Sequence, residues 1–480
     1  MFLAGCAVPL GPGYQVERQQ VEVRYLPASP ACLHVRAVYR LKNIGNRELT
    51  FIEAALPDEE SFGRQNLRGH VDGREVSLRP AVEGGASSVR IAFDPPWPQK
   101  HRRSVLLEYD LAPAPPGHAG VAVNDGSFHV RDATAFPQLR APKGLFARGG
   151  EQPHEVDFAI EVPADFLAFA SDREQGSRRR GGETEWRYRV GRKGVETFVA
   201  AGRYHEQQVT VGGETVLFWT LEPLPAERAL VAANRIAATF ETFRATFGPL
   251  WKNPRPVRLI ETPARLTGRS AVGGDLAALA LRPGALLNRQ AFALDVSSDA
   301  FLDLVEHELA HTWFGQVVTP RPEAELVLGE GLTEYAAVVA AEARGGEAAR
   351  QSWVALLLRR FDEARKKAAD KPLLRLEASD PAEQRAFAFS KGALFFVALE
   401  DRYGKGNVRR ALAHIVRSLR GDQFGYPELL SALELETRQS VGEFFRLWLD
   451  QTGIPAEFRA RYEVKEQGSE EREPKKELRR

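Results

Sequence analysis

One stretch, residues 305–335, limits what this chain can be more than any other. It contains the pattern His-Glu-x-x-His at His307, Glu308 and His311, and Glu330 follows after a gap of eighteen residues. Positions i and i+4 of a helix share one face, so the two imidazoles can point at a single ion. The pattern therefore predicts a metal site on a helix, with Glu330 as its third ligand.

The set of donor groups indicates which metal and which chemistry to expect. Catalytic zinc sites use three protein ligands and keep one position open for water, and two His with one Glu is a known set. Glu308 lies about 100° round the helix from His307, where its carboxylate could take a proton from bound water. We predict one zinc ion held by His307, His311 and Glu330, with Glu308 as the general base of a hydrolase.

The neighbouring residues indicate that this helix is buried. Apolar side chains cover nearly its whole circumference, namely Phe301, Leu302, Leu304, Val305, Leu309, Trp313 and Phe314. Two imidazoles and a carboxylate in such a helix are costly unless they are paired or hold a metal. Ser297, Ser298 and Asp299 offer oxygens that can cap its N-terminus, and Gly315 is placed to end it. A solvated surface helix is therefore the disfavoured alternative.

A second helix is predicted to carry Glu330. Gly329 and Gly331 flank this residue, and each glycine costs a helix roughly 0.5–1 kcal/mol relative to Ala. That cost is understandable if backbone, substrate or metal must come close at this point. Glu334 follows one turn later on the same face. It is a candidate to accept a hydrogen bond from a ligating His, and an ordinary exposed helix Glu is the alternative.

Several segments together resemble the gluzincin metallopeptidases of the aminopeptidase N family. They are VEHELAHTWFGQ (305–316), EGLTEY (330–335), FSKG (389–392), FRLWLDQTGIPAEF (445–458), ATAFPQL (133–139) and VETFVAAGRY (195–204). The resemblance extends over most of residues 135–458 and identifies the chain as a divergent, bacterial member. It implies a β-rich N-terminal domain, a thermolysin-like catalytic domain, one zinc ion and peptide substrates.

The first departure from the family pattern is at Phe389, where the family has a tyrosine in Y-x-K-G. The resemblance implies that this tyrosine donates a hydrogen bond to the oxyanion of the tetrahedral intermediate. Losing one such donor costs about 10²–10³ in rate, which weakens an enzyme without silencing it. Zinc alone or another donor would have to compensate, and Tyr426 and His414 are the nearest polar candidates by region.

The second departure lies at GGDLA, residues 273–277, where the family's G-x-M-E-N segment would fall. We place Gly273, Gly274 and Asp275 in the predicted substrate cleft with Phe389. Leu276 replaces the glutamate that binds a free substrate amine in the family. Asp275 could supply a substitute carboxylate, although a turn Asp is the alternative. The sequence therefore does not support aminopeptidase specificity.

The remaining patterns predict an α+β multidomain protein, because 480 residues exceed what one hydrophobic core usually holds. Alternating apolar residues indicate antiparallel strands in the first half, and helical spacing follows. The predicted parts are a signal or lipobox remnant (1–13), an N-terminal antiparallel β-domain (14–222), a thermolysin-like zinc catalytic domain (223–345), a C-terminal helical segment completing the catalytic unit (346–465) and a disordered charged tail (466–480).

The first six residues, MFLAGC, resemble the lipobox of bacterial lipoproteins, with Cys6 as the lipidated residue. The charged and apolar regions that precede a lipobox are missing, so we interpret the segment as the tail of a signal peptide. The expected location is the bacterial cell envelope, as a periplasmic lipoprotein. A chance match in a cytoplasmic protein is the alternative.

Charge and hydropathy limit the partners. A net charge of +1 favours no nucleic acid, and no apolar run reaches the ~18 residues of a spanning helix. We predict a peptide or protein substrate, with membrane contact only through a lipid on Cys6. The open alternatives are a weak or inactive zinc-containing scaffold that binds peptides, and an unrelated zinc hydrolase of small amides or epoxides. The presence of Glu308 favours the enzyme, because a structural zinc site needs no base.

Overall fold

The computed structural model describes residues 13–28, 30–56, 63–83, 86–112, 121–131, 136–140, 155–171, 173–191, 198–250, 255–262, 278–281, 283–295, 298–377 and 380–462. The chain forms two compact units. Unit 1 comprises Met1–Thr319 with Leu419–Gln423, and unit 2 comprises Pro320–Ser418 with Phe424–Arg480. Among the helices in these ranges, none is long and apolar enough to cross a membrane.

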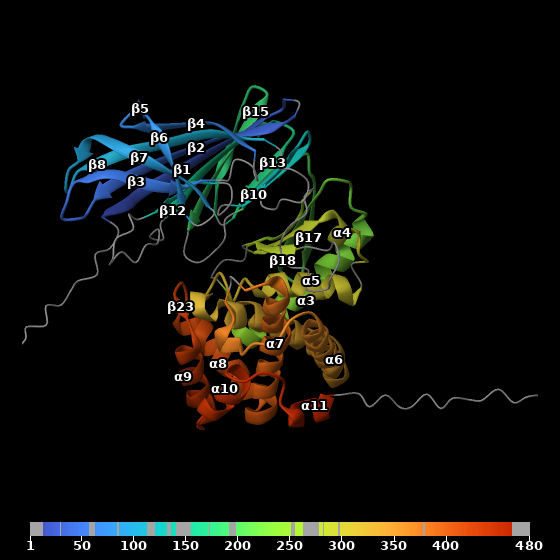
Figure 1. The fold of residues 1–480 in the computed structure, drawn as a ribbon. Helices are drawn as coiled ribbons and strands as arrows, with labels where there is room; N and C mark the ends of the chain where they lie inside the picture. The colour runs from blue at the N-terminus through green and yellow to red at the C-terminus, as the bar shows by residue number, and fades with distance from the viewer. Residues whose placement is uncertain are drawn as a thin grey trace, which may run out of the picture. The chain divides into compact units, whose positions relative to one another are not determined.

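Within the described ranges, unit 1 contains a sheet of eight strands, seen in Figure 1. They are β1 (Tyr14–Leu26), β2 (Cys32–Asn43), β4 (Arg64–Val71), β5 (Arg74–Val76), β8 (Arg102–Leu111), β12 (Glu155–Pro163), β14 (Arg173–Arg180) and β15 (Glu183–Gly191). Their order is β14-β15-β12-β1-β2-β8-β4-β5. Val21, Val23 and Tyr25 alternate with exposed residues and are buried, as the period-2 pattern predicts.

The pairing in this sheet is antiparallel except at one place. β1 pairs with β12 in parallel, with Val21 opposite Phe158, whereas β1 and β2 run antiparallel, with Val21 opposite Ala37. The sequence predicted only antiparallel strands here. Alternation within a strand reports which face is buried and carries no information on the direction of a neighbour that is distant in sequence.

The described residues of unit 1 also form two smaller sheets and a mixed sheet. One runs β13-β16-β10-β9 and another β11-β3-β7-β6, made of β3 (Leu49–Ala55), β6 (Leu78–Glu83), β7 (Ala86–Trp97), β9 (Val121–Asn124), β10 (Ser127–Arg131), β11 (Gln138–Arg140), β13 (Leu167–Ala170) and β16 (Phe198–Gly202). The mixed sheet runs β17-β18-β19-β21-β20, made of β17 (His205–Val211), β18 (Glu214–Thr220), β19 (Val257–Thr262), β20 (Ala278–Leu281) and β21 (Gly284–Asn288). The predicted boundary at residue 222 falls between β18 and β19, which are paired strands of this sheet.

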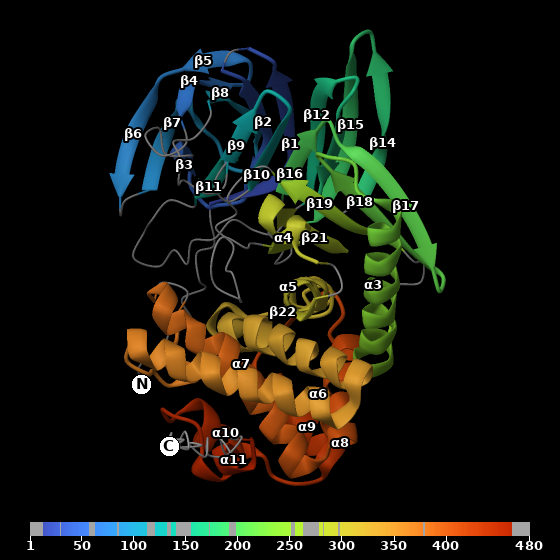
Figure 2. The ribbon, with the colours of Figure 1, turned by 90° about the vertical axis from the view of Figure 1, so that its right-hand side faces the viewer.

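Three helices accompany the mixed sheet: α3 (Ala226–Phe247), α4 (Arg289–Ala293) and α5 (Asp299–Ala310). Figure 2 shows α3 beside β17 and β18, which it contacts. Trp313 packs against Phe240 and Phe243 of α3, and its indole N–H donates to the Gly248 carbonyl at 2.9 Å. These contacts fix the segment that follows α5 against α3.

Unit 2 is helical in its described residues, as the sequence predicted for the C-terminal part. Its elements are η1 (Pro322–Ala324), η2 (Glu325–Gly331), α6 (Leu332–Lys367), η3 (Leu373–Arg375), α7 (Ala382–Tyr403), α8 (Lys405–Ser418), α9 (Tyr426–Thr437), α10 (Gly442–Leu449) and α11 (Ala456–Tyr462), with two-residue strands β22 (Thr319–Pro320) and β23 (Gln423–Phe424) at the limits of the units. Figure 2 shows α6 and α7 lying side by side, in agreement with their contacts.

Candidate metal centre

The helix that carries the His-Glu-x-x-His pattern is α5. Its N-cap is Ser298, whose Oγ accepts a hydrogen bond from the Phe301 N–H at 3.2 Å, as predicted. The predicted C-terminus at Gly315 is wrong, because α5 ends at Ala310 and His311 occupies the C-cap. The chain turns there, and Trp313 N donates to the Ala310 carbonyl.

His311 lies where the chain leaves the helix, and its ring has a backbone partner. Its Nδ1 lies 3.4 Å from the Phe314 carbonyl oxygen, so a proton on Nδ1 would leave Nε2 free to bind a metal. Gly315 adopts a φ of 155°, and a Cβ there would lie 3.0 Å from the His311 carbonyl oxygen. The glycine therefore permits the close turn around His311 and does not act as a helix cap.

The other ligand predicted from the sequence, Glu330, belongs to η2, which is a π-helix. We predicted a helix here, and the structure adds the π form, which is often found at functional sites. The hydroxyl of Thr333 donates to the Glu330 carbonyl at 2.9 Å. The chain then continues directly into α6, whose first ten residues, 332–341, are buried.

His307, His311 and Glu330 can each offer one ligand atom, and these atoms all lie within 4.8 Å of one another. A tetrahedral zinc ion holds nitrogen and oxygen ligands at about 2.0–2.2 Å from the metal, and the grouping is close enough for all three atoms to face a single ion. His307 is 4% exposed. Of the three residues only His307 is buried, and His311 and Glu330 are partly exposed. Two imidazoles and a carboxylate in this grouping suit a zinc ion, whose charge compensates for the burial of polar groups.

The predicted base, Glu308, is 6% exposed and follows His307 directly on α5. Sequence reasoning did not identify its neighbour Glu306, which is 1% exposed. One carboxylate oxygen of Glu306 accepts a hydrogen bond from the Thr239 hydroxyl on α3 at 3.0 Å. Glu306 therefore ties α5 to α3, a long-range contact that no local pattern signals.

Glu334 is completely buried, so the alternative of an exposed helix Glu is wrong. Its Oε1 accepts a hydrogen bond from Arg360 at 2.7 Å, within the same helix α6. Arg360 lies beyond the kink at Gly346, where φ is 66°. The role of Glu334 toward a ligating His stays a prediction.

Phe389 lies on α7 and is half-buried. The residues that follow it have structural partners within unit 2. Lys391 is fully buried, and its Nζ donates to the Gln451 carbonyl. Burial lowers the pKa of Lys391 to about 8, against the opposing effect of Asp370. Lys391 thus holds α7 to the segment between α10 and α11.

The remaining predicted residues divide into two groups. Tyr426 has a buried hydroxyl, and both burial and Glu323 raise its pKa; its role as an oxyanion donor stays a prediction, as does that of His414 on α8. The other group lies outside the described residues and consists of Cys6, Gly273, Gly274 and Asp275.

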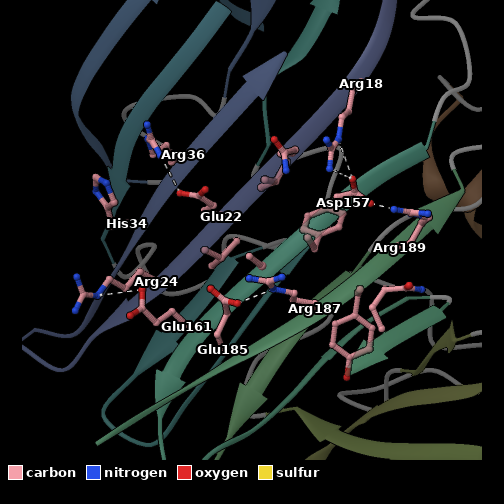
Figure 3. A pocket seen from close by; sticks show the side chains of 17 residues that line it. Arg18, Glu22, Arg24, His34, Arg36, Asp157, Glu161, Glu185, Arg187 and Arg189 are labelled. Carbon is pink, nitrogen blue, oxygen red and sulfur yellow. Dashed lines mark hydrogen bonds and ion pairs between the residues drawn. The ribbon is translucent and has the colours of Figure 1, made fainter. Parts of the chain in front are cut away.

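A hollow of about 610 Å³ lies on the eight-stranded sheet and is shown in Figure 3. Asp157 accepts from Arg18 at 2.9 Å and from Arg189 at 2.8 Å; burial raises its pKa, but these hydrogen bonds outweigh it and the net shift is downward. The pairs Arg36–Glu22 and Arg187–Glu185 lie nearby. Because both signs of charge are paired within the sheet, this hollow resembles a solvated network of ion pairs rather than a catalytic site.

Comparisons with known proteins agree with the resemblance inferred from the sequence. Residues 276–448 match the family model described as Peptidase family M1 domain. The "Probable aminopeptidase 1" of Saccharolobus solfataricus is 25% identical over 253 residues, which are 51% of this chain and 31% of that protein. Aminopeptidase N of Lactobacillus delbrueckii subsp. lactis is 28% identical over 165 residues, 32% of this chain and 19% of that protein. The chain thus spans a third or less of these relatives.

Solved structures extend the likeness over nearly the whole chain. The M1 zinc metallopeptidase of Deinococcus radiodurans has a TM-score of 0.63 and 19% identity, covering 92% of this chain and 95% of that one. A variant of that protein bound to a Tyr-Ser-Ala substrate gives the same score and covers 96% of its chain. At this identity the likeness establishes the fold, and it confirms the predicted multidomain architecture.

Proposed function

We propose that the chain is an aminopeptidase N-like gluzincin and that it acts as a zinc-dependent metallopeptidase that hydrolyses peptide bonds. The grouping of His307, His311 and Glu330 beside a buried Glu308 is the observation that carries the proposal. The tripeptide in the Deinococcus radiodurans structure supports peptides as the substrate class.

In this proposal His307, His311 and Glu330 hold the ion, and Glu308 handles the protons. A bound zinc ion would polarise the scissile carbonyl and lower the pKa of its water toward ~7. The Glu308 carboxylate accepts the proton of the attacking water and returns it to the nitrogen of the departing amine.

The two departures from the family pattern lead to a more specific proposal about the rate and the substrate specificity. Phe389 cannot donate a hydrogen bond to an oxyanion, and Leu276 cannot bind a substrate amine. We therefore propose a peptidase that is slower than its relatives and does not require a free N-terminus. The lipid on Cys6 and the envelope location stay predictions of the sequence.

The test is cleavage of a mixed peptide library by the purified protein, read by mass spectrometry. We expect cleavage that stops when zinc is removed by a chelator and returns when one equivalent of zinc is restored. The cut positions then report whether a free N-terminus is needed. If the zinc-loaded protein leaves the whole library intact but retains peptides, the peptidase proposal fails and the peptide-binding scaffold replaces it.

Replacing Phe389 with Tyr should raise kcat at least severalfold. The added hydroxyl would supply an oxyanion donor, and an aligned donor is worth about 10²–10³ in rate. Steady-state kinetics on a peptide found in the library would measure the gain. Phe389→Leu is the control, because it alters the same position without adding a donor. A folded Phe389→Tyr variant with an unchanged or lower kcat would contradict the prediction.

A further inference from the structure

Gly331, next to Glu330, lies where η2 and α7 come together. A Cβ added to Gly331 would lie 2.8 Å from the Ala388 carbonyl oxygen and 2.9 Å from the Gly392 Cα. A Cβ added to Gly392 would in turn lie 3.0 Å from the Gly331 Cα. The two glycines therefore bring the backbones of η2 and α7 into direct contact.

Space, and not backbone conformation, is the reason for glycine here. Gly331 has a φ of −65° and a ψ of −35°, which any residue adopts without strain. Glycine in a helix costs roughly 0.5–1 kcal/mol relative to Ala, so two facing glycines represent an appreciable cost. The atoms that would be struck belong to the backbone of α7, and no side-chain rotation can move them away.

The helix α7 is itself firmly held, so it does not yield to η2. Lys391 is anchored on the Gln451 carbonyl, and Phe387 and Ala388 are completely buried. The hydroxyl of Tyr335, at the start of α6, donates to Glu400 of α7 at 2.6 Å. A larger residue at position 331 must therefore displace the η2 segment rather than α7.

We propose that the contact of Gly331 with Ala388 and Gly392 sets the position of Glu330 as a metal ligand. The inference rests on the proposed function. Moving a Cβ from 2.8 Å to the 3.4 Å of ordinary contact requires a shift of about 0.6 Å. Ligand distances in metal sites tolerate about 0.2 Å. Gly331 and Gly392 are thus positioning residues that act on the metal through Glu330.

The contact also links two parts of the site that are distant in sequence. Phe389 precedes Ser390 and Lys391 on α7, one turn before Gly392, while Gly331 adjoins Glu330. Contacts that fix residues 388–392 of α7 therefore also fix the position of the Phe389 segment relative to the Glu330 segment. The contact therefore gives Gly392, the last residue of the F-S-K-G segment, a structural role that is separate from that of Phe389.

The experiment compares Gly331→Ala with Gly442→Ala in the full-length protein. Gly442 is the matched control, because it begins a helix of the same unit and a Cβ there would meet nothing within 4 Å. Zinc affinity is measured by competition with a chromogenic chelator, and the absorption spectrum of the cobalt-substituted protein reports ligand geometry. We expect Gly331→Ala to bind zinc about 10–100-fold more weakly, with an altered cobalt spectrum, and Gly442→Ala to match the wild type.

Two further variants make the outcome decisive. Combining Gly331→Ala with Glu330→Gln should weaken zinc binding no more than Glu330→Gln alone, because both act on one ligand. Gly392→Ala makes a milder clash and replaces Gly331→Ala if the latter does not fold. Folded Gly331→Ala and Gly392→Ala variants with wild-type zinc affinity, beside a weakened Glu330→Gln, would overturn the inference. A wild-type protein that binds no zinc would instead refute the proposed function.

Discussion

Replacing Glu308 with Gln should lower kcat/KM for every cleaved peptide by about 10²–10⁴, the usual contribution of a general base. Gln preserves the shape of the side chain and cannot accept a proton at neutral pH. Because Glu308 is not one of the three grouped ligands, the variant should still bind one zinc ion per chain. Loss of activity with retention of zinc is the combination that identifies a base.

Steady-state kinetics and the zinc content of the purified protein measure this prediction. Glu306→Gln provides a matched control, since Glu306 is also a buried carboxylate and lies two residues away on α5. One of its oxygens accepts the hydrogen bond from Thr239, and an amide oxygen can accept it as well, so we expect its kcat to stay near the wild-type value. Equal kcat/KM for Glu308→Gln and wild type would place the base elsewhere.

Replacing Arg350 with Met should destabilise unit 2 by about 3 kcal/mol. Arg350 is 1% exposed and donates to the Tyr462 hydroxyl at 2.6 Å and to Glu400 at 3.1 Å. Removing one partner of a buried ion pair costs about 3–5 kcal/mol, because the remaining charge loses its compensation. We expect the lower end, since Glu400 keeps Arg409 at 2.7 Å.

The pKa of Arg350 agrees with a strongly stabilised charge. Burial lowers that pKa, and the combined effect of Tyr462, Glu400 and Asp401 outweighs it, so the net shift is upward. Arg350 therefore connects α6 with α7 and α11 in its charged form. Loss of this side chain should affect all three helices together.

Urea unfolding followed by far-UV circular dichroism measures the effect of Arg350→Met. Arg446→Met is the control, because Arg446 is 74% exposed and lies 3.9 Å from Glu443 on the surface of the same unit. Exposed pairs of this kind contribute little to stability, so its midpoint should not move. A midpoint for Arg350→Met equal to that of Arg446→Met would show that the network is not needed for stability.

Much of the fold and of the candidate site could be predicted from local patterns. The cap at Ser298 and the burial of Val21, Val23 and Tyr25 follow from residues close in sequence. The pairing of β1 with β12, by contrast, joins segments that are far apart, and no alternation pattern indicates its direction. Local patterns likewise could not predict the burial of Glu334, because its partner Arg360 lies beyond a kink in α6.

The sequence by itself determined which groups are available for the chemistry. His307 and His311 share a helical face because they are four residues apart, and Glu308 must then lie beside them. Only the tertiary structure decided how Glu330 is held, since the contact between Gly331 and Gly392 joins two separate helices. Spacing along one helix is a local property, whereas the approach of two backbones depends on the packing of every residue between them.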